Sequence, residues 1–260
     1  MKTPHWLRLA KYYFDYCRLY VAQFGLPAAA RTFLLTRRSQ INNGTVISVP
    51  LARFAAPLKL RYGTSDIAAF EKIFVWGEYA IRHQGKAKTI IDCGANIGLS
   101  VIWFAARHPN ARIVALEPDS ENYALLLENT RHLENLVTLR AGVWGRTCAL
   151  TLANPGAASD SYQYNESPSS SAEKIKAFDI ETLRSNHQME TIDLLKMDIE
   201  GAEEFVFVDG CNKWLAVTSQ LVIEIHNTRA RRAIEKQLNY LPHRHSLSGE
   251  NDVFDLRPMS

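Results

Sequence analysis

Polar side chains directly follow each of four apolar stretches of the sequence, and their types suit the binding of a small polar ligand. The polar positions are the turn Asp92–Gly98, Glu117, the pair Asp198 and Glu200, and the pair His226 and Asn227. Carboxylates and imidazoles accept hydrogen bonds from hydroxyl groups and can remove protons from them. A single polar residue at the end of a strand often caps the helix that follows. Four strands that each end in polar residues instead indicate a binding and catalytic site.

The turn Asp92–Gly98 is the most informative of these positions. Gly94 and Gly98 can adopt positive φ angles and let the backbone approach a ligand closely. A dinucleotide-binding fingerprint that starts at Gly94 needs two further glycines, and this turn does not place them at the required spacing. Glu117 lies 25 residues after the start of the turn and can accept hydrogen bonds from both hydroxyls of a ribose. The pattern predicts a nucleoside ligand without a pyrophosphate, such as S-adenosylmethionine, rather than NAD.

Apolar stretches that alternate with amphipathic ones indicate the elements that must position these residues. Strands are predicted at 89–93, 112–116, 136–143, 148–152, 192–197 and 220–225. Helices are predicted at 99–107, 120–133 and 229–241, before a terminal hairpin through Gly249, and 154–171 is predicted to be a surface loop. Alternating strands and helices are typical of an α/β fold with a doubly wound, mostly parallel sheet, which binds its ligand at the carboxyl ends of the strands.

The first part of the chain has a different pattern of predicted elements. Residues 1–38 are predicted to form two helices separated by a break at Gly25-Leu26-Pro27. Short strands are predicted at 45–49 and 58–62. Thr64-Ser65-Asp66 offers capping side chains for a helix over about 67–74.

Two further segments, Lys196-Met197-Asp198-Ile199-Glu200-Gly201-Ala202-Glu203 and Glu224-Ile225-His226, make the sequence resemble the FkbM-type family of class I S-adenosylmethionine-dependent methyltransferases. Leu60–Asp66 and Gly77-Glu78-Tyr79 are also similar to that family. The resemblance implies a Rossmann-like class I methyltransferase fold with a C-terminal antiparallel hairpin and an N-terminal helical extension. It divides the chain into a basic extension, residues 1–57, and a methyltransferase domain, residues 58–260, with the lead-in segment 58–88.

The resemblance also implies the cofactor, the reaction and the residues of the site. S-adenosyl-L-methionine is expected as the cofactor, and a hydroxyl of a sugar, a glycan or a related natural product as the methyl acceptor. Catalytic roles are expected for Asp198, Glu200 and His226. Cofactor contacts are expected from Asp92, Gly94, Ala95, Asn96, Gly98, Glu117, Gly142 and Val143.

The sequence leaves several alternatives open. His226 is either a general base or a residue that orients the substrate, and Glu203 is interpreted as an acid favoured at a helix start. Asp198, His226 and Asn227 are a thin donor set for magnesium, so no metal is predicted. A non-catalytic nucleoside-binding module is the alternative function. A nucleic-acid acceptor is disfavoured because Asp198 is followed by Ile199-Glu200 and not by the Pro-Pro-aromatic run that usually accompanies base methylation.

Composition narrows the class of protein further. The 260 residues are 47% apolar and 22% charged, which is typical of a folded globular protein. The four cysteines include no C-x-x-C pair, so neither a zinc knuckle nor a disulfide framework is predicted. A cytoplasmic location is therefore expected.

Positive charge is concentrated at the N-terminal end. Residues 1–62 carry ten Lys or Arg against one acid, a balance of +9, whereas the rest of the chain balances to −6. Charges interrupt the apolar stretch 6–24 too often for a membrane-spanning helix or a signal peptide. Two hypotheses remain for this amphipathic stretch: it packs on the main domain, or it contacts an anionic membrane surface. The aromatic residues available for that contact are Trp6, Tyr12, Tyr13, Phe14, Tyr16 and Tyr20.

Overall fold

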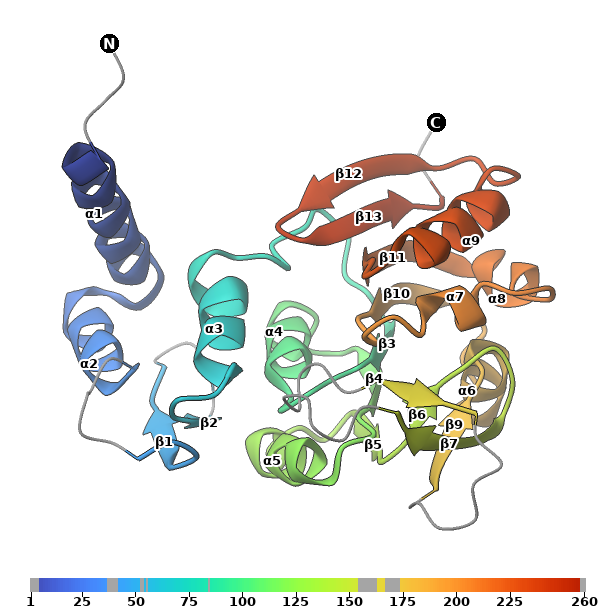
Figure 1. The fold of residues 1–260 in the computed structure, drawn as a ribbon, viewed down its shortest axis with the longest axis horizontal. Helices are drawn as coiled ribbons and strands as arrows, with labels where there is room; N and C mark the ends of the chain where they lie inside the picture. The colour runs from blue at the N-terminus through green and yellow to red at the C-terminus, as the bar shows by residue number, and fades with distance from the viewer. Residues whose placement is uncertain are drawn as a thin grey trace. The chain divides into compact units, whose positions relative to one another are not determined.

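The chain divides into two compact units, residues 1–78 and 79–260. The structure is a computed structural model, and it describes residues 5–36, 42–51, 54, 56–83, 85–153, 163–166 and 174–257. Figure 1 draws the chain from blue at the N-terminus to red at the C-terminus. Among the helices of the described residues, none is both long enough and apolar enough to cross a bilayer. The functional boundary between residues 57 and 58 stays a prediction.

The first unit consists of helices and one small antiparallel pair of strands. Its elements are α1 (His5–Phe24), α2 (Leu26–Thr36), β1 (Val46–Val49), β2 (Leu58–Arg61), α3 (Asp66–Phe70) and the π-helical turn η1 (Glu71–Val75). Gly25, at a φ of +74°, separates the two long helices at the predicted break. The two strands pair with Val46 opposite Arg61, so the predicted short strands are confirmed.

The helix predicted over residues 67–74 differs in detail, because it changes from α- to π-helical geometry after Phe70. Only Thr64 acts as a cap, its Oγ1 accepting the amide of Asp66 at 3.2 Å. The Asp66 carboxylate instead accepts the backbone amide of Arg61 and both ends of its guanidinium at 2.8–2.9 Å. This buried carboxylate therefore joins β2 to α3.

An aromatic cluster forms the core of the first unit. Tyr16 and Tyr20 of α1 are each 2% exposed, and both hydroxyls donate to Oε1 of Glu71, at 2.5 and 3.1 Å. Phe33 of α2 packs edge-on against both tyrosine rings. These two tyrosines are therefore not available for the membrane contact that one of the two hypotheses assigned to the aromatic residues, because η1 and α2 cover them. The side chains of Trp6, Tyr12 and Tyr13 lie outside the described residues.

The second unit is built around a seven-stranded sheet. In spatial order its strands are β12 (Arg244–Ser248), β13 (Asn251–Asp255), β11 (Thr218–Glu224), β10 (Ile192–Met197), β3 (Thr89–Cys93), β4 (Arg112–Leu116) and β5 (Leu136–Leu139). The five strands from β11 to β5 are parallel, and the hairpin β12–β13 joins them antiparallel. The predicted doubly wound, mostly parallel sheet with a C-terminal hairpin is confirmed.

The strand predicted over residues 136–143 is wrong as a single strand. The main sheet keeps only β5, and Gly142–Val143 form β6 in a separate small sheet. That sheet has the order β6-β9-β7-β8, with β7 (Cys148–Leu152), β8 (Tyr164–Asn165) and β9 (Ile175–Phe178). The chain changes sheets because Gly142 pairs with Ala177 of β9. Of the predicted loop 154–171, residues 154–162 and 167–171 lie outside the described residues.

Helices cover both faces of the main sheet (Figure 1). On one face lie α4 (Leu99–Arg107) and α5 (Ser120–Thr130), and on the other α6 (Ile180–Asn186), α7 (Glu203–Val206), α8 (Asn212–Leu215) and α9 (Thr228–Leu238). Neither β9 nor α6 was predicted from the sequence, and no secondary structure was predicted for the segment 200–215.

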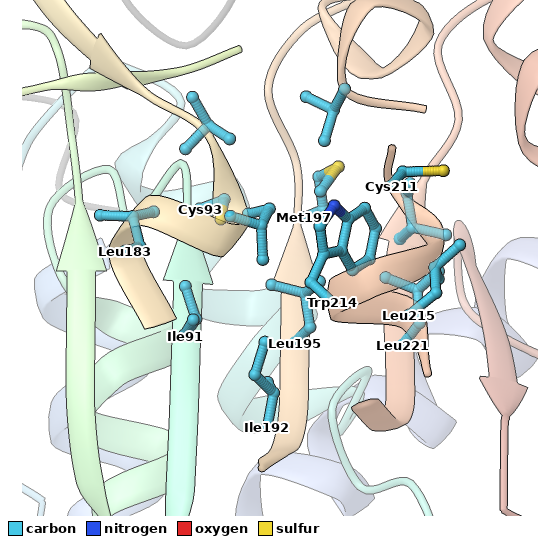
Figure 2. Close-up of a cluster of buried hydrophobic side chains, with 14 of the residues drawn as sticks. Ile91, Cys93, Leu183, Ile192, Leu195, Met197, Cys211, Trp214, Leu215 and Leu221 are labelled. Atoms are coloured by element: carbon cyan, nitrogen blue, oxygen red, sulfur yellow. The ribbon is translucent and has the colours of Figure 1, made fainter. Parts of the chain in front are cut away.

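The face under α6 to α9 is closed by a cluster of apolar side chains, shown in Figure 2. Ile91 and Cys93 of β3 and Leu195 and Met197 of β10 contribute to this cluster, and Trp214 covers it from α8. Since successive side chains of a strand point to opposite faces, the residues between them face α4 and α5. Those alternate positions hold two charged groups, Asp92 and Lys196.

A buried ion pair joins the two central strands at this point. Asp92 and Lys196 are register partners of β3 and β10, and Lys196 Nζ lies 3.2 Å from Asp92 Oδ1. Asp92 is fully buried and Lys196 is 2% exposed. Burial by itself lowers the pKa of Lys196, but the nearby carboxylates, first Asp92 and then Asp198, outweigh it and raise that pKa above its usual value. Lys196 therefore stays a cation inside the protein.

We expect Lys196→Met to lower the free energy of unfolding by about 3–5 kcal/mol, because it leaves the buried Asp92 carboxylate without its counter-ion. Urea unfolding followed by circular dichroism measures the change. The double variant Lys196→Met/Asp92→Asn should regain part of the loss, and Lys213→Met, at an exposed lysine of α8, is the matched control. A single variant Lys196→Met as stable as the unmodified protein would contradict this account of the pair.

Candidate functional site

A hollow opens at the carboxyl ends of the central strands, where the order of the sheet reverses between β3 and β10. Parallel α/β sheets bind ligands at such switch points. The hollow measures about 660 Å³, including the part that is open to solvent. Its lining consists of Gly94, Asn96, Glu117, Pro118, Asn122, Ala141, Gly142, Val143, Leu150, Tyr164, Asp198, Ile199, Glu200 and Ala202.

The turn after β3 forms one wall of the hollow. The amides of Gly94 and Ala95 both donate to the carbonyl of Leu116, at 3.0 and 2.8 Å, which holds the turn against β4. Gly94 has a φ of +77°, and a Cβ atom there would lie 1.8 Å from the carbonyl oxygen of Asp198. Any other residue would therefore push the turn away from the end of β10, so this glycine is required by the protein itself.

Asn96 lines the hollow, and its side chain carries an unused acceptor. Its backbone is left-handed, at a φ of +49°, and its amide donates to Glu117 Oε2 at 2.8 Å. Its side-chain Oδ1 is buried and accepts no hydrogen bond within the described part of the chain. Because a buried polar atom without a partner is costly, a ligand with a donor group at this position would be favoured.

Glu117 lines the hollow beside this turn, directly after β4, and is 6% exposed. Its two oxygens accept the amides of Asn96 and Asp119, at 2.8 and 3.0 Å. Burial raises the pKa of this carboxyl to about 7, although the two amides offset part of the rise. The free site therefore exchanges a proton near neutral pH.

The structure brings most of the predicted cofactor residues together. Gly94, Asn96, Glu117, Gly142 and Val143 line the hollow. Asp92, Ala95 and Gly98 do not line it. The amides of Ala95 and Gly98 instead donate to the carbonyls of Leu116 and Ala95 and so stabilise the turn. Asp92 accepts the hydroxyl of Ser100 at 2.6 Å in addition to its pairing with Lys196.

The predicted catalytic residues form an acidic cluster around one imidazole. His226 Nε2 lies 3.6 Å from Asp198, 3.5 Å from Glu200 and 3.7 Å from Glu224. On its other side, His226 Nδ1 lies 2.9 Å from Oε1 of the fully buried Glu203. Asp198 and Glu200 also line the hollow, whereas His226 is not among its lining residues.

This environment determines the charge of the imidazole. Burial by itself lowers the pKa of His226, but the hydrogen bond to Glu203 and the charges of Glu203, Glu200 and Asp198 outweigh it. The net effect raises the pKa to about 9. His226 is therefore protonated at neutral pH, which disfavours the first of its two predicted roles, that of a general base.

The donor set considered for a metal differs from the expected one. Asn227 Oδ1 accepts the amide of Ala230 at 2.8 Å and caps α9, so it is committed to that helix. Ligand atoms of Asp198, Glu224 and His226 lie within 4.8 Å of one another instead. Because His226 is protonated here, its charge already balances part of this acidic group.

The contacts that Lys196 and Glu203 make in the site could not be predicted from the sequence, although both residues belong to the segment 196–203 identified there. Lys196 Nζ donates to the carbonyl of Gly94 at 2.5 Å and lies 3.8 Å from Asp198. Glu203 was assigned to a helix start, and it does begin α7, but it also accepts the amides of Ile199 and Gly201 at 3.3 Å. The signal for both was the dense alternation of charges from 196 to 203, which is unusual after a buried strand.

Comparison with known proteins agrees with this geometry. A family model described as the methyltransferase FkbM domain matches residues 92–247. No curated protein sequence matches the chain. The region matched by the family model includes the turn after β3, Glu117, Asp198 and His226.

Solved structures with a similar fold include the following three proteins. The FkbM methyltransferase of Methylobacillus flagellatus is 16% identical, with a TM-score of 0.47, over 68% of this chain and 45% of that one. Fibrillarin of Aeropyrum pernix, solved with S-adenosyl-L-methionine, is 14% identical, with a TM-score of 0.42, over 85% and 86%. TYW2 of M. jannaschii, solved with AdoMet, is 13% identical, with a TM-score of 0.43, over 84% and 89%.

This chain spans less than half the length of the Methylobacillus protein. The family model, in contrast, covers more than half of this sequence. The chain therefore belongs to the FkbM methyltransferase domain family, and its doubly wound sheet is the Rossmann-like class I methyltransferase fold.

Proposed function

We propose that this protein transfers a methyl group from S-adenosyl-L-methionine to a hydroxyl oxygen of a sugar, a glycan or a related natural product. The observation that carries the proposal is the hollow at the switch point, which Glu117 and Asn96 line together with Asp198 and Glu200. It combines acceptors for a nucleoside with carboxylates that can take up a proton. Membership of the FkbM family supports methyl transfer as the reaction.

The residues of the hollow fit this cofactor in three respects. Glu117 offers a carboxylate to the two ribose hydroxyls, and each of its oxygens accepts one backbone amide, which leaves further lone pairs for a ligand. Asn96 Oδ1 is a buried acceptor without a partner, which suits a ligand amino group. Gly94 lets the backbone of the turn and of Asp198 approach each other closely beside the ligand space.

The bound cofactor supplies a methyl group on a positively charged sulfur. The protein must align an acceptor oxygen with that methyl and remove the proton of the hydroxyl. Asp198 suits the second task, because its carboxylate is 28% exposed and lines the hollow. The buried Lys196 holds it from one side, and the imidazolium of His226 from the other.

A hydroxyl of a sugar or another polyol is the acceptor that this edge of the sheet suits best. Asp198 and Glu200 are partly exposed and can accept hydrogen bonds from neighbouring hydroxyls. The run after Asp198, Ile199-Glu200-Gly201, lacks the prolines that usually accompany base methylation. The alternative function, a non-catalytic nucleoside-binding module, predicts cofactor binding without turnover.

We expect Glu117→Gln to weaken S-adenosyl-L-methionine binding at least tenfold at pH 8, because a charge-assisted hydrogen bond contributes ~1.5–3 kcal/mol. Ribose hydroxyls favour the ionised carboxylate. With a pKa of about 7 in the free site, affinity should therefore rise about tenfold from pH 6 to pH 8, as the ionised fraction grows. Isothermal titration calorimetry at both pH values measures this.

The glutamine variant should also lose the pH dependence, since it has no proton to release. Glu121→Gln, at an exposed acid of the same region, is the matched control and should bind normally. Unchanged cofactor affinity in a folded Glu117→Gln protein would contradict the proposal that Glu117 binds the two ribose hydroxyls.

We expect Asp198→Asn to reduce turnover at least a hundredfold, because a general base contributes ~10²–10⁴-fold, and to change cofactor affinity less than threefold. Turnover is measured as release of S-adenosylhomocysteine with a panel of monosaccharides, glycans, lipid-linked glycans and polyols, and mass spectrometry locates the methyl group. Asp209→Asn, at an exposed acid, is the control. Cofactor binding with no release from any acceptor would favour the non-catalytic module.

The pH profile separates Asp198 from His226 as the base. With a His226 pKa of about 9, histidine catalysis would make kcat rise up to pH 9. We expect kcat to level off below pH 8 and His226→Gln to lower it without moving the profile. A rise through pH 9 that His226→Gln abolishes would assign the base to His226.

A further inference from the structure

The first unit exposes an unusual amount of apolar surface. It contains six of the twelve large apolar side chains that are exposed in the described part of the chain. On α1 and α2 these are Phe14, Val21, Leu26 and Leu34, and three of them are about 70% exposed. The aromatic cluster around Glu71 does not use them, since Tyr16, Tyr20 and Phe33 form its contacts.

Basic side chains accompany these apolar ones on the same faces. On α1, Lys11, Phe14, Arg18 and Val21 follow at spacings of three and four residues, opposite the buried Tyr16 and Tyr20, and all four are exposed. On α2, the exposed Arg31 lies between the exposed Leu26 and Leu34. Six of these exposed side chains define what is called here the α1–α2 surface: Lys11, Phe14, Arg18, Leu26, Arg31 and Leu34.

We propose that the α1–α2 surface docks this protein on a bilayer of anionic phospholipid. Residues 1–62 have a charge balance of +9, whereas the rest of the chain balances to −6, so the net positive charge that complements such a bilayer lies at this end. An interfacial helix inserts leucine and phenylalanine among the acyl chains and keeps lysine and arginine at the headgroups.

The mixture of side chains selects this partner over RNA. A surface that binds nucleic acid depends on phosphate contacts and stacking rings, and exposed leucines contribute to neither. Leu26 and Leu34, at 70% and 68% exposure, gain free energy only when an apolar phase covers them. The arginine between them then meets the lipid phosphates.

The test is co-sedimentation of the full chain with vesicles of phosphatidylcholine containing 30% phosphatidylglycerol, or of phosphatidylcholine alone. We expect binding to the anionic vesicles at 50 mM salt, a steep fall by 300 mM salt, and little binding to the neutral vesicles. Leu26→Gln/Leu34→Gln should weaken the partition at least tenfold, and Lys11→Gln/Arg18→Gln/Arg31→Gln roughly a hundredfold.

Matched controls come from the second unit. Leu247→Gln removes an equally exposed leucine, and Arg229→Gln/Arg232→Gln/Arg244→Gln removes three exposed arginines. Both should bind vesicles as the unmodified protein does, with unchanged circular dichroism in every variant. Equal binding to both kinds of vesicle overturns the proposal. So does unchanged binding by the two α1–α2 variants, or salt-sensitive capture of single-stranded RNA in preference to anionic vesicles.

Discussion

The contact between Lys196 and Asp92 links the fold to the site. One ammonium group pairs with the carboxylate of the neighbouring strand, donates to the carbonyl of Gly94 and lies beside Asp198. A buried pair of this kind adds little net stability, because both charges must leave water. What it specifies is register: a slip of one residue would move Lys196 to the face occupied by Leu195 and Met197. The turn and the candidate base are thus aligned by the same group.

The acidic groups of the site fall into two environments with different chemistry. Glu117 is enclosed near backbone amides, and burial raises its pKa to about 7. The carboxylates around His226 instead share one imidazolium, and the pKa of that ring rises to about 9. A group that takes up protons at neutral pH therefore lies where a nucleoside is proposed to bind. The carboxylates that surround the protonated His226 lie where a hydroxyl is proposed to react. Residues of both environments line the same hollow.

The strands that carry the site could be predicted from the sequence, because each is a short apolar run that ends in polar residues. β3, β4 and β10 begin and end where the periodicity indicates. The division of 136–143 into β5 and β6 could not be predicted, since the apolar pattern continues and the division depends on Ala177, far along the chain. The role of Glu203 was missed for the same reason: its partner His226 belongs to another strand end. The local pattern of apolar and polar residues predicted where the strands end. The contacts between residues far apart in the sequence became known only from the structure.

The pairing of β3 with β10 has a consequence for how the protein acquires its activity. These neighbours in the sheet are separated by about a hundred residues of sequence, so the chain must close a long loop before they meet. A partly folded chain that has formed only β3, β4 and β5 lacks Asp198 and one wall of the hollow. Ligand binding is therefore coupled to completion of the whole sheet, and a ligand at a hundred times its Kd would stabilise the folded domain by about 2.7 kcal/mol.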